Sequence, residues 1–81
     1  MSVEQRVKEV VSRQLKVKIE DVRLESDFVN DLGADSMASI ELVAAFEAEF
    51  DIEMDEDAAL SVKNVGDAVT FIEKVIDEQH H

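Results

Sequence analysis

Apolar residues recur at helical spacing in three separate stretches of this 81-residue chain, over residues 3–15, 36–50 and 65–77. Polar and charged residues fill the positions between them, as on amphipathic helices. The sequence has no proline and only two glycines, so the residues that most often break helices are nearly absent. A further helical turn is expected over residues 55–60. The pattern predicts an all-α bundle of three main helices with a short helix between the second and the last.

The composition favours one small domain that is held by packing alone. Cysteine is absent, which excludes disulfides and thiolate metal sites. We expect a single domain over residues 1–78, and we interpret residues 79–81 as a frayed end or an artificial addition. No apolar run approaches membrane-spanning length, and charges at Glu4, Arg6 and Lys8 argue against a signal peptide. A cytoplasmic monomer without membrane insertion is therefore expected.

Residues 16–35 follow no single period and are predicted to form a long loop. Seven apolar residues in it are expected to pack on the core: Val17, Ile19, Val22, Leu24, Phe28, Val29 and Leu32. A structureless loop of this length in a compact domain usually has a function or contains an unrecognised helical turn. At the helix starts, Ser2 is a plausible N-cap of the first helix, and Asp35 or Ser36 of the second.

The net charge of -12 belongs entirely to the middle of the chain. Residues 24–62 hold twelve acidic residues and no Lys or Arg, whereas the other eight acidic residues are balanced by eight basic ones. Nucleic acid is disfavoured as a partner, because binding to its phosphates relies on clustered Lys and Arg. A basic protein surface is the expected complement.

The helix predicted over residues 36–50 has two apolar faces. The face expected to meet the core contains Ser39, Leu42, Val43, Phe46 and Phe50. The opposite face contains Met37, Ile40, Ala44 and Ala48, with Glu41 and Glu47 at its edges. A helix in so small a domain cannot bury both faces internally. The second face is therefore either a docking surface or a set of scattered exposed apolar residues.

Ser36 begins this helix without a base that would turn it into a nucleophile. The two histidines are the last two residues, so a Ser/His arrangement has almost no support. The carboxylates lie at exposed helix positions, which gives no cleft to separate their pKa values for acid and base roles. Calcium loops that start at Asp27 or Asp51 have unsuitable residues at required positions. We expect neither catalytic residues nor a metal site, and Ser36 is either a helix cap or a residue on which another protein acts.

The segment Asp31-Leu32-Gly33-Ala34-Asp35-Ser36-Met37, followed by Ile40-Glu41-Leu42-Val43 and Phe50-Asp51-Ile52-Glu53, resembles the modification site and second helix of the acyl carrier proteins. The resemblance covers nearly the whole chain, and its Gly-x-Asp-Ser-[Leu/Met] core is specific in an acidic helical domain of this length. Departures from the usual pattern include Met37 for leucine, and Ala38 and Ala48 where acids are frequent. Partner preference is therefore expected to differ.

The resemblance implies that Ser36 receives a 4'-phosphopantetheine arm through a phosphodiester bond, installed by a separate magnesium-dependent phosphopantetheinyl transferase. The arm ends in a thiol, which would carry acyl chains as thioesters, so the chain itself would not be an enzyme. Gly33 would keep the approach to Ser36 unobstructed. Asp35 would orient the site for the transferase or only cap the helix. A phosphodiester at a helix N-terminus also faces unpaired N–H groups.

The resemblance further implies a docking face and an acyl pocket. Met37, Ile40 and Ala44 would give apolar contact to partner enzymes, and Asp35, Glu41 and Glu47 would meet basic docking patches on them. The acyl chain would lie among seven residues: Phe28, Leu42, Phe46, Met54, Val62, Ala68 and Phe71. The expected function is to carry growing acyl chains to fatty acid synthesis enzymes. The alternatives are a specialised lipid or polyketide carrier, and an unmodified acidic adaptor for basic partners.

Overall fold

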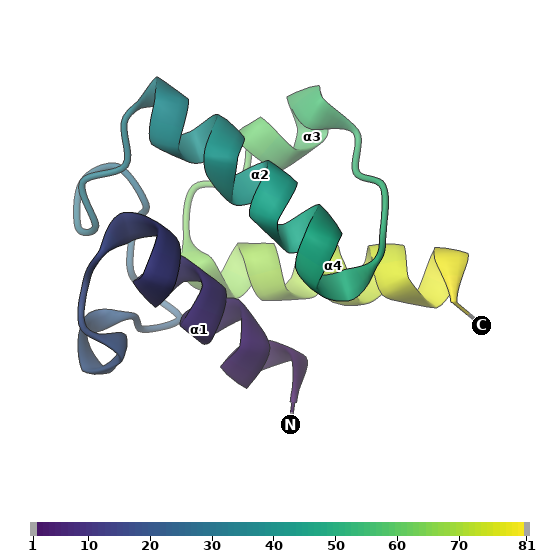
Figure 1. Cartoon of the computed structure of the whole chain (residues 1–81), viewed down its shortest axis with the longest axis horizontal. Helices are drawn as coiled ribbons and strands as arrows, with labels where there is room; N and C mark the ends of the chain where they lie inside the picture. The colour runs from purple at the N-terminus through teal and green to yellow at the C-terminus, as the bar shows by residue number, and fades with distance from the viewer. Residues whose placement is uncertain (1, 81) are drawn as a thin grey trace.

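The computed structural model describes residues 2–80, and within them the chain is helical. Its elements are α1 (Val3–Leu15), the short 3-10 helix η1 (Ile19–Asp21), α2 (Ser36–Phe50), α3 (Glu56–Leu60) and α4 (Val65–Gln79). The α1 helix packs against both α2 and α4, and α3 lies beside α2 (Figure 1). The predicted all-α bundle is confirmed. No helix among residues 2–80 is long and apolar enough to cross a membrane.

Side chains at the start of each α-helix accept a backbone N–H from three residues further along. These N-caps are Ser2, Asp35, Asp55 and Asn64, with N···O distances of 2.8 to 3.1 Å. Such caps satisfy N–H groups that have no carbonyl partner within the helix. The Ser2 cap was predicted, and of the two candidates for the cap of α2 the structure selects Asp35.

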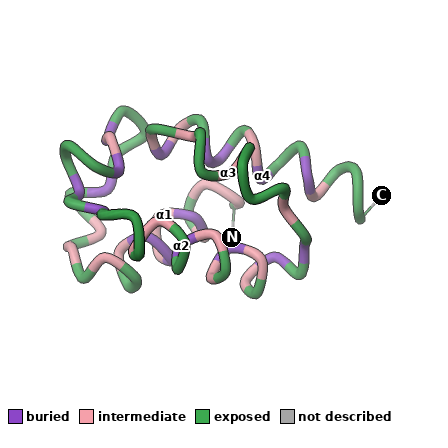
Figure 2. Tube along the Cα trace, turned by 90° about the horizontal axis from the view of Figure 1, so that it is seen from above, coloured by how far each residue is buried: buried purple, intermediate pink, exposed green. Residues whose placement is uncertain are grey.

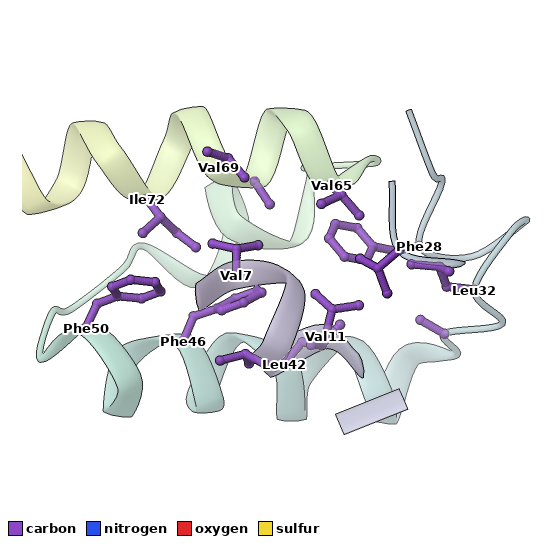
Figure 3. Packing of buried hydrophobic residues seen from close by; sticks show 14 of the residues in the cluster. Val7, Val11, Phe28, Leu32, Leu42, Phe46, Phe50, Val65, Val69 and Ile72 are labelled. Atoms are coloured by element: carbon purple, nitrogen blue, oxygen red, sulfur yellow. The ribbon is translucent and has the colours of Figure 1, made fainter. Parts of the chain in front are cut away.

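The core forms where α1 lies between α2 and α4. Val7 of α1 is fully buried and points between Phe46 of α2 and Ile72 of α4 (Figure 3). The predicted inner face of α2 is confirmed, since Leu42, Phe46 and Phe50 are all buried. The same holds for the stripe on α4, where successive turns contribute the β-branched residues Val65, Val69, Ile72 and Val75 to this core. Packing of these three faces is what fixes the position of the α2 N-terminus.

The long loop between α1 and α2 alternates between buried and exposed residues (Figure 2). Its residues Val22, Phe28 and Leu32 are buried as expected, and η1 is the unrecognised helical turn. The expectation was wrong for Leu24 and Val29, which are 41% and 61% exposed. The backbone of the loop is bound to α4 at Leu24, since the Gly66 N–H donates to the Leu24 carbonyl at 2.8 Å.

The C-terminal end of α4 differs from the sequence-based interpretation. The helix was expected to stop near residue 77, and residues 79–81 were interpreted as a frayed end or an artificial addition, but the helix continues to Gln79. The Gln79 side chain exchanges two hydrogen bonds with the backbone of Glu53, and the His80 ring donates to the Asp51 carbonyl. These contacts join segments far apart in the sequence, which a helical period cannot reveal. Met1 and His81 lie outside the described residues.

Candidate functional site: a serine at a helix start beside an apolar cavity

Ser36 is the first residue of α2 and is exposed. The preceding residue, Asp35, has an extended backbone, and its Oδ1 accepts the Ala38 N–H at 2.8 Å. The N–H groups of Ser36 and Met37 come earlier in this first turn, where helix geometry provides no carbonyl partner. A negatively charged group attached to the Ser36 hydroxyl would therefore lie at the positive end of the helix dipole.

The chain reaches Ser36 through a tight turn at Gly33. This residue has a φ of +73°, a conformation that side chains disfavour, and its N–H donates to the Val29 carbonyl at 3.2 Å. No heavy atom lies within 4 Å of where a Cβ would be, so the space beside Gly33 is open. The next residue, Ala34, is buried, and its N–H donates to the Phe28 carbonyl at 2.8 Å. Gly33 thus turns the chain from the buried loop to the exposed serine.

The second apolar face of α2 is exposed along its length. Met37 and Ile40 are 66% and 47% exposed, and Ala44 and Ala48 are exposed as well. Glu41 is also exposed on this helix. Glu47 is placed differently from the sequence-based expectation, because its Oε2 accepts the Met54 N–H at 2.9 Å and is part-buried. This carboxylate holds the backbone of its own chain, so it is only in part available to a partner.

A cavity of about 390 Å³ lies between α2, α3, α4 and the loop before α2. All seven residues of the expected acyl pocket line it: Phe28, Leu42, Phe46, Met54, Val62, Ala68 and Phe71. Small-molecule sites in proteins commonly measure about 300–1,000 Å³. The structure therefore brings these residues together around enough space for a ligand.

A hollow beside Ser36 shares part of its lining with this cavity. The hollow is lined by Ala34, Asp35, Ser36 and Ile40 together with Val29, Ser39 and Leu60, and the last three also line the cavity. Sequence reasoning missed all three shared residues as site residues. Val29 was expected to pack on the core, and Leu60, an apolar residue of α3, is 40% exposed.

Within residues 2–80, no three acidic or histidine side chains are grouped closely enough to hold a metal ion. Two acidic side chains of the loop before α2 instead accept hydrogen bonds from backbone N–H groups. Asp27 accepts from Val29 and Asn30, and Asp31 accepts from Asp27. These hydrogen bonds shape the turn that leads to Gly33.

A comparison with known protein families identifies the chain. The sequence profile described as "Phosphopantetheine attachment site" matches residues 5–72, which is most of the sequence. The chain belongs to this family. Among solved structures, it is similar to a proposed acyl carrier protein from Mycobacterium tuberculosis, at 29% identity and a TM-score of 0.83. The match covers 90% of this chain and 97% of that one. The protein is thus a carrier rather than an enzyme, and its cofactor is covalently attached 4'-phosphopantetheine.

The residues at the start of α2 fit such a cofactor. A phosphodiester requires a hydroxyl to which it can be attached, room for the arm, and donors for its anionic oxygens. Ser36 supplies an exposed hydroxyl, and the hollow beside it supplies room. The free N–H groups of the first turn supply donors. When attached, the cofactor provides the thiol that holds an acyl group as a thioester.

Proposed function

We propose that Ser36 is the attachment point of the phosphopantetheine arm, and that the protein carries growing acyl chains as thioesters to the enzymes of fatty acid synthesis in the cytoplasm. The observation that carries the proposal is the continuity of the site. The exposed serine at the start of α2 lines a hollow, and three residues of that hollow also line an apolar cavity. A tethered chain could pass from solvent to the cavity along this route.

The cavity suits the apolar part of an acyl chain. Each buried CH₂ contributes roughly 0.8 kcal/mol, so six methylenes of an octanoyl group contribute at most about 5 kcal/mol. Small domains are stabilised by only about 5–15 kcal/mol in total. Burial of the chain would therefore change the stability of the whole molecule, and it would also keep the chain away from water between partner enzymes.

The exposed face of α2 suits partners that are basic and partly apolar. Met37 and Ile40 offer apolar contact next to Ser36, and Glu41 and Asp35 offer negative charge. Contacts between opposite charges raise association rates and select partners more than they add affinity. A carrier needs this balance, because it must leave each enzyme after transfer. The phosphopantetheinyl transferase would use the same face.

Intact mass tests the attachment site. The protein is incubated with coenzyme A, Mg²⁺ and a phosphopantetheinyl transferase. We expect a gain of about 340 Da, the mass of the arm, in the unchanged protein and none in Ser36→Ala. Ser39→Ala is the matched control, because Ser39 lies one helical turn further along α2 and is only half exposed. The control should gain the full mass.

The outcomes separate the proposal from the alternatives. A gain that persists in Ser36→Ala would move the attachment to another residue, and no gain at all would favour an unmodified adaptor. If the arm is attached, assays with purified fatty acid synthesis enzymes test whether the protein serves that pathway. Malonyl transfer and elongation on the holo protein support a role in fatty acid synthesis. Loading by the transferase without elongation would favour a specialised lipid or polyketide route.

A further inference from the structure

The connector between α2 and α3, residues 51–55, is held in place by side chains from two helices. From α2, the Glu47 carboxylate accepts the Met54 N–H at 2.9 Å. From the end of α4, the Gln79 amide accepts the Glu53 N–H at 2.9 Å and donates to the Glu53 carbonyl at 2.7 Å. The connector is thus fixed at Glu53 and at the N–H of Met54. In Figure 1 it leaves the end of α2 beside the C-terminal half of α4 and runs away from α4 to α3.

Met54 also forms part of the cavity wall, at the end remote from Ser36. The cavity follows α2 from Ser39 to Phe46, a distance of about 10 Å at 1.5 Å per residue. Since Glu47 follows Phe46 and binds the Met54 N–H, Met54 lies at the Phe46 end of this space. Its side chain is half-buried and lines the cavity. A chain that enters beside Ser36 would meet Met54 last.

We infer that Gln79 is a positioning residue that limits the length of the acyl chain the cavity accepts. This inference rests on the proposed function and assigns one specific role within it. The Gln79 amide holds Glu53, and through it the adjoining Met54, so a long chain must displace a wall that is tied to α4. A short chain ends before it reaches Met54 and does not depend on this tie. Because the methionine side chain is flexible, the position of the backbone sets the limit on the length of the acyl chain.

The test compares short and long chains on the same protein. The unchanged protein, Gln79→Ala and Gln14→Ala are each converted to holo, butyryl and dodecanoyl forms, and their melting temperatures are measured. Gln14 is the matched control, an exposed glutamine on α1. We expect the dodecanoyl form of Gln79→Ala to gain about 4 °C more over its own butyryl form than the unchanged protein does. Gln14→Ala should show the unchanged difference.

Two results would overturn the inference, and they are distinguishable from a failure of the proposed function. An equal loss of melting temperature in all three forms of Gln79→Ala would mean that Gln79 only stabilises the fold. A smaller dodecanoyl gain would mean that the tie supports the long chain rather than excluding it. If no variant takes the arm at all, the proposed function fails at the loading step, before any chain length is compared.

Discussion

Asp35 shows how one side chain beside Ser36, the proposed attachment point, can have a purely structural explanation. Its Oδ1 caps α2 through the Ala38 N–H, which stabilises the helix start that presents Ser36. Sequence reasoning left open whether Asp35 caps the helix or orients the site for the transferase. The structure contains the cap. A partner that also recognises Asp35 would do so through the charge of its carboxylate.

Replacing Asp35 by Asn and by Ala separates the two roles. Asn retains an oxygen that can cap, so Asp35→Asn should lower the stability by less than about 0.5 kcal/mol, whereas Asp35→Ala should lower it by about 1 kcal/mol. Urea unfolding measures both. If the charge guides the transferase, both variants lose loading rate to a similar extent. Loading that is lost only in Asp35→Ala would leave capping as the whole role of Asp35.

The residues that could be predicted at the site are those with a local sequence signal. Gly33, Asp35 and Ser36 follow one another in a short motif, and the two faces of α2 follow from its period. The role of Glu47 could not be predicted, since a carboxylate that binds the N–H of Met54 looks like any other acidic residue on an exposed face. Val29 was wrongly expected to pack on the core, because a loop has no periodicity that shows whether an apolar side chain faces the core or the solvent.

At the scale of elements, the helix starts and the amphipathic faces were accessible from the sequence. The caps at Ser2 and Asp35 and the apolar period define α1 and α2 locally. The connector and the end of α4 were not accessible. Their position depends on hydrogen bonds between Gln79 and Glu53, 26 residues apart, and no local pattern encodes such a pairing.

The exposed face of α2 predicts how charge affects association with basic partners. Glu41→Lys should slow loading by the transferase several-fold at low ionic strength, because it places a positive charge on the proposed docking face. Glu73→Lys is the charge-matched control on α4, where the residue is exposed. Stopped-flow or discontinuous assays over a range of salt concentrations measure the effect, which should shrink as salt rises. Equal slowing by both variants would point to net charge instead of a docking face.

At the scale of the whole molecule, Arg6 joins α1 to the end of α2. Its Nε lies 3.0 Å from the Glu49 Oε2, and its Nη2 donates to the Glu49 carbonyl at 2.7 Å. The guanidinium also lies 4.5 Å from the centre of the Phe50 ring. In the part of the chain that the structure describes, this arginine connects two of the three helices that enclose the core. Its contacts are only partly buried, which limits the ion-pair contribution.

Two variants should separate the contribution of the carboxylate charge to stability from that of the other Arg6 contacts. Arg6→Met removes the carbonyl hydrogen bond, the ion pair and the stacking on Phe50, and should lower the stability by about 1–2 kcal/mol. Glu49→Gln removes only the carboxylate charge and should cost less than about 0.5 kcal/mol. Thermal unfolding of both variants provides the comparison. A larger loss for Glu49→Gln would mean that the ion pair dominates.

The melting temperature of the octanoyl-loaded protein, measured against that of the holo protein, tests most directly whether the cavity beside Ser36 shelters an acyl chain. We expect a rise of at least about 5 °C, because burial of even a fraction of the methylenes adds more than 1 kcal/mol. Ala68→Leu, which fills the cavity from α4, should abolish most of this rise. An octanoyl form that melts at the same temperature as the holo form would contradict a sheltered chain.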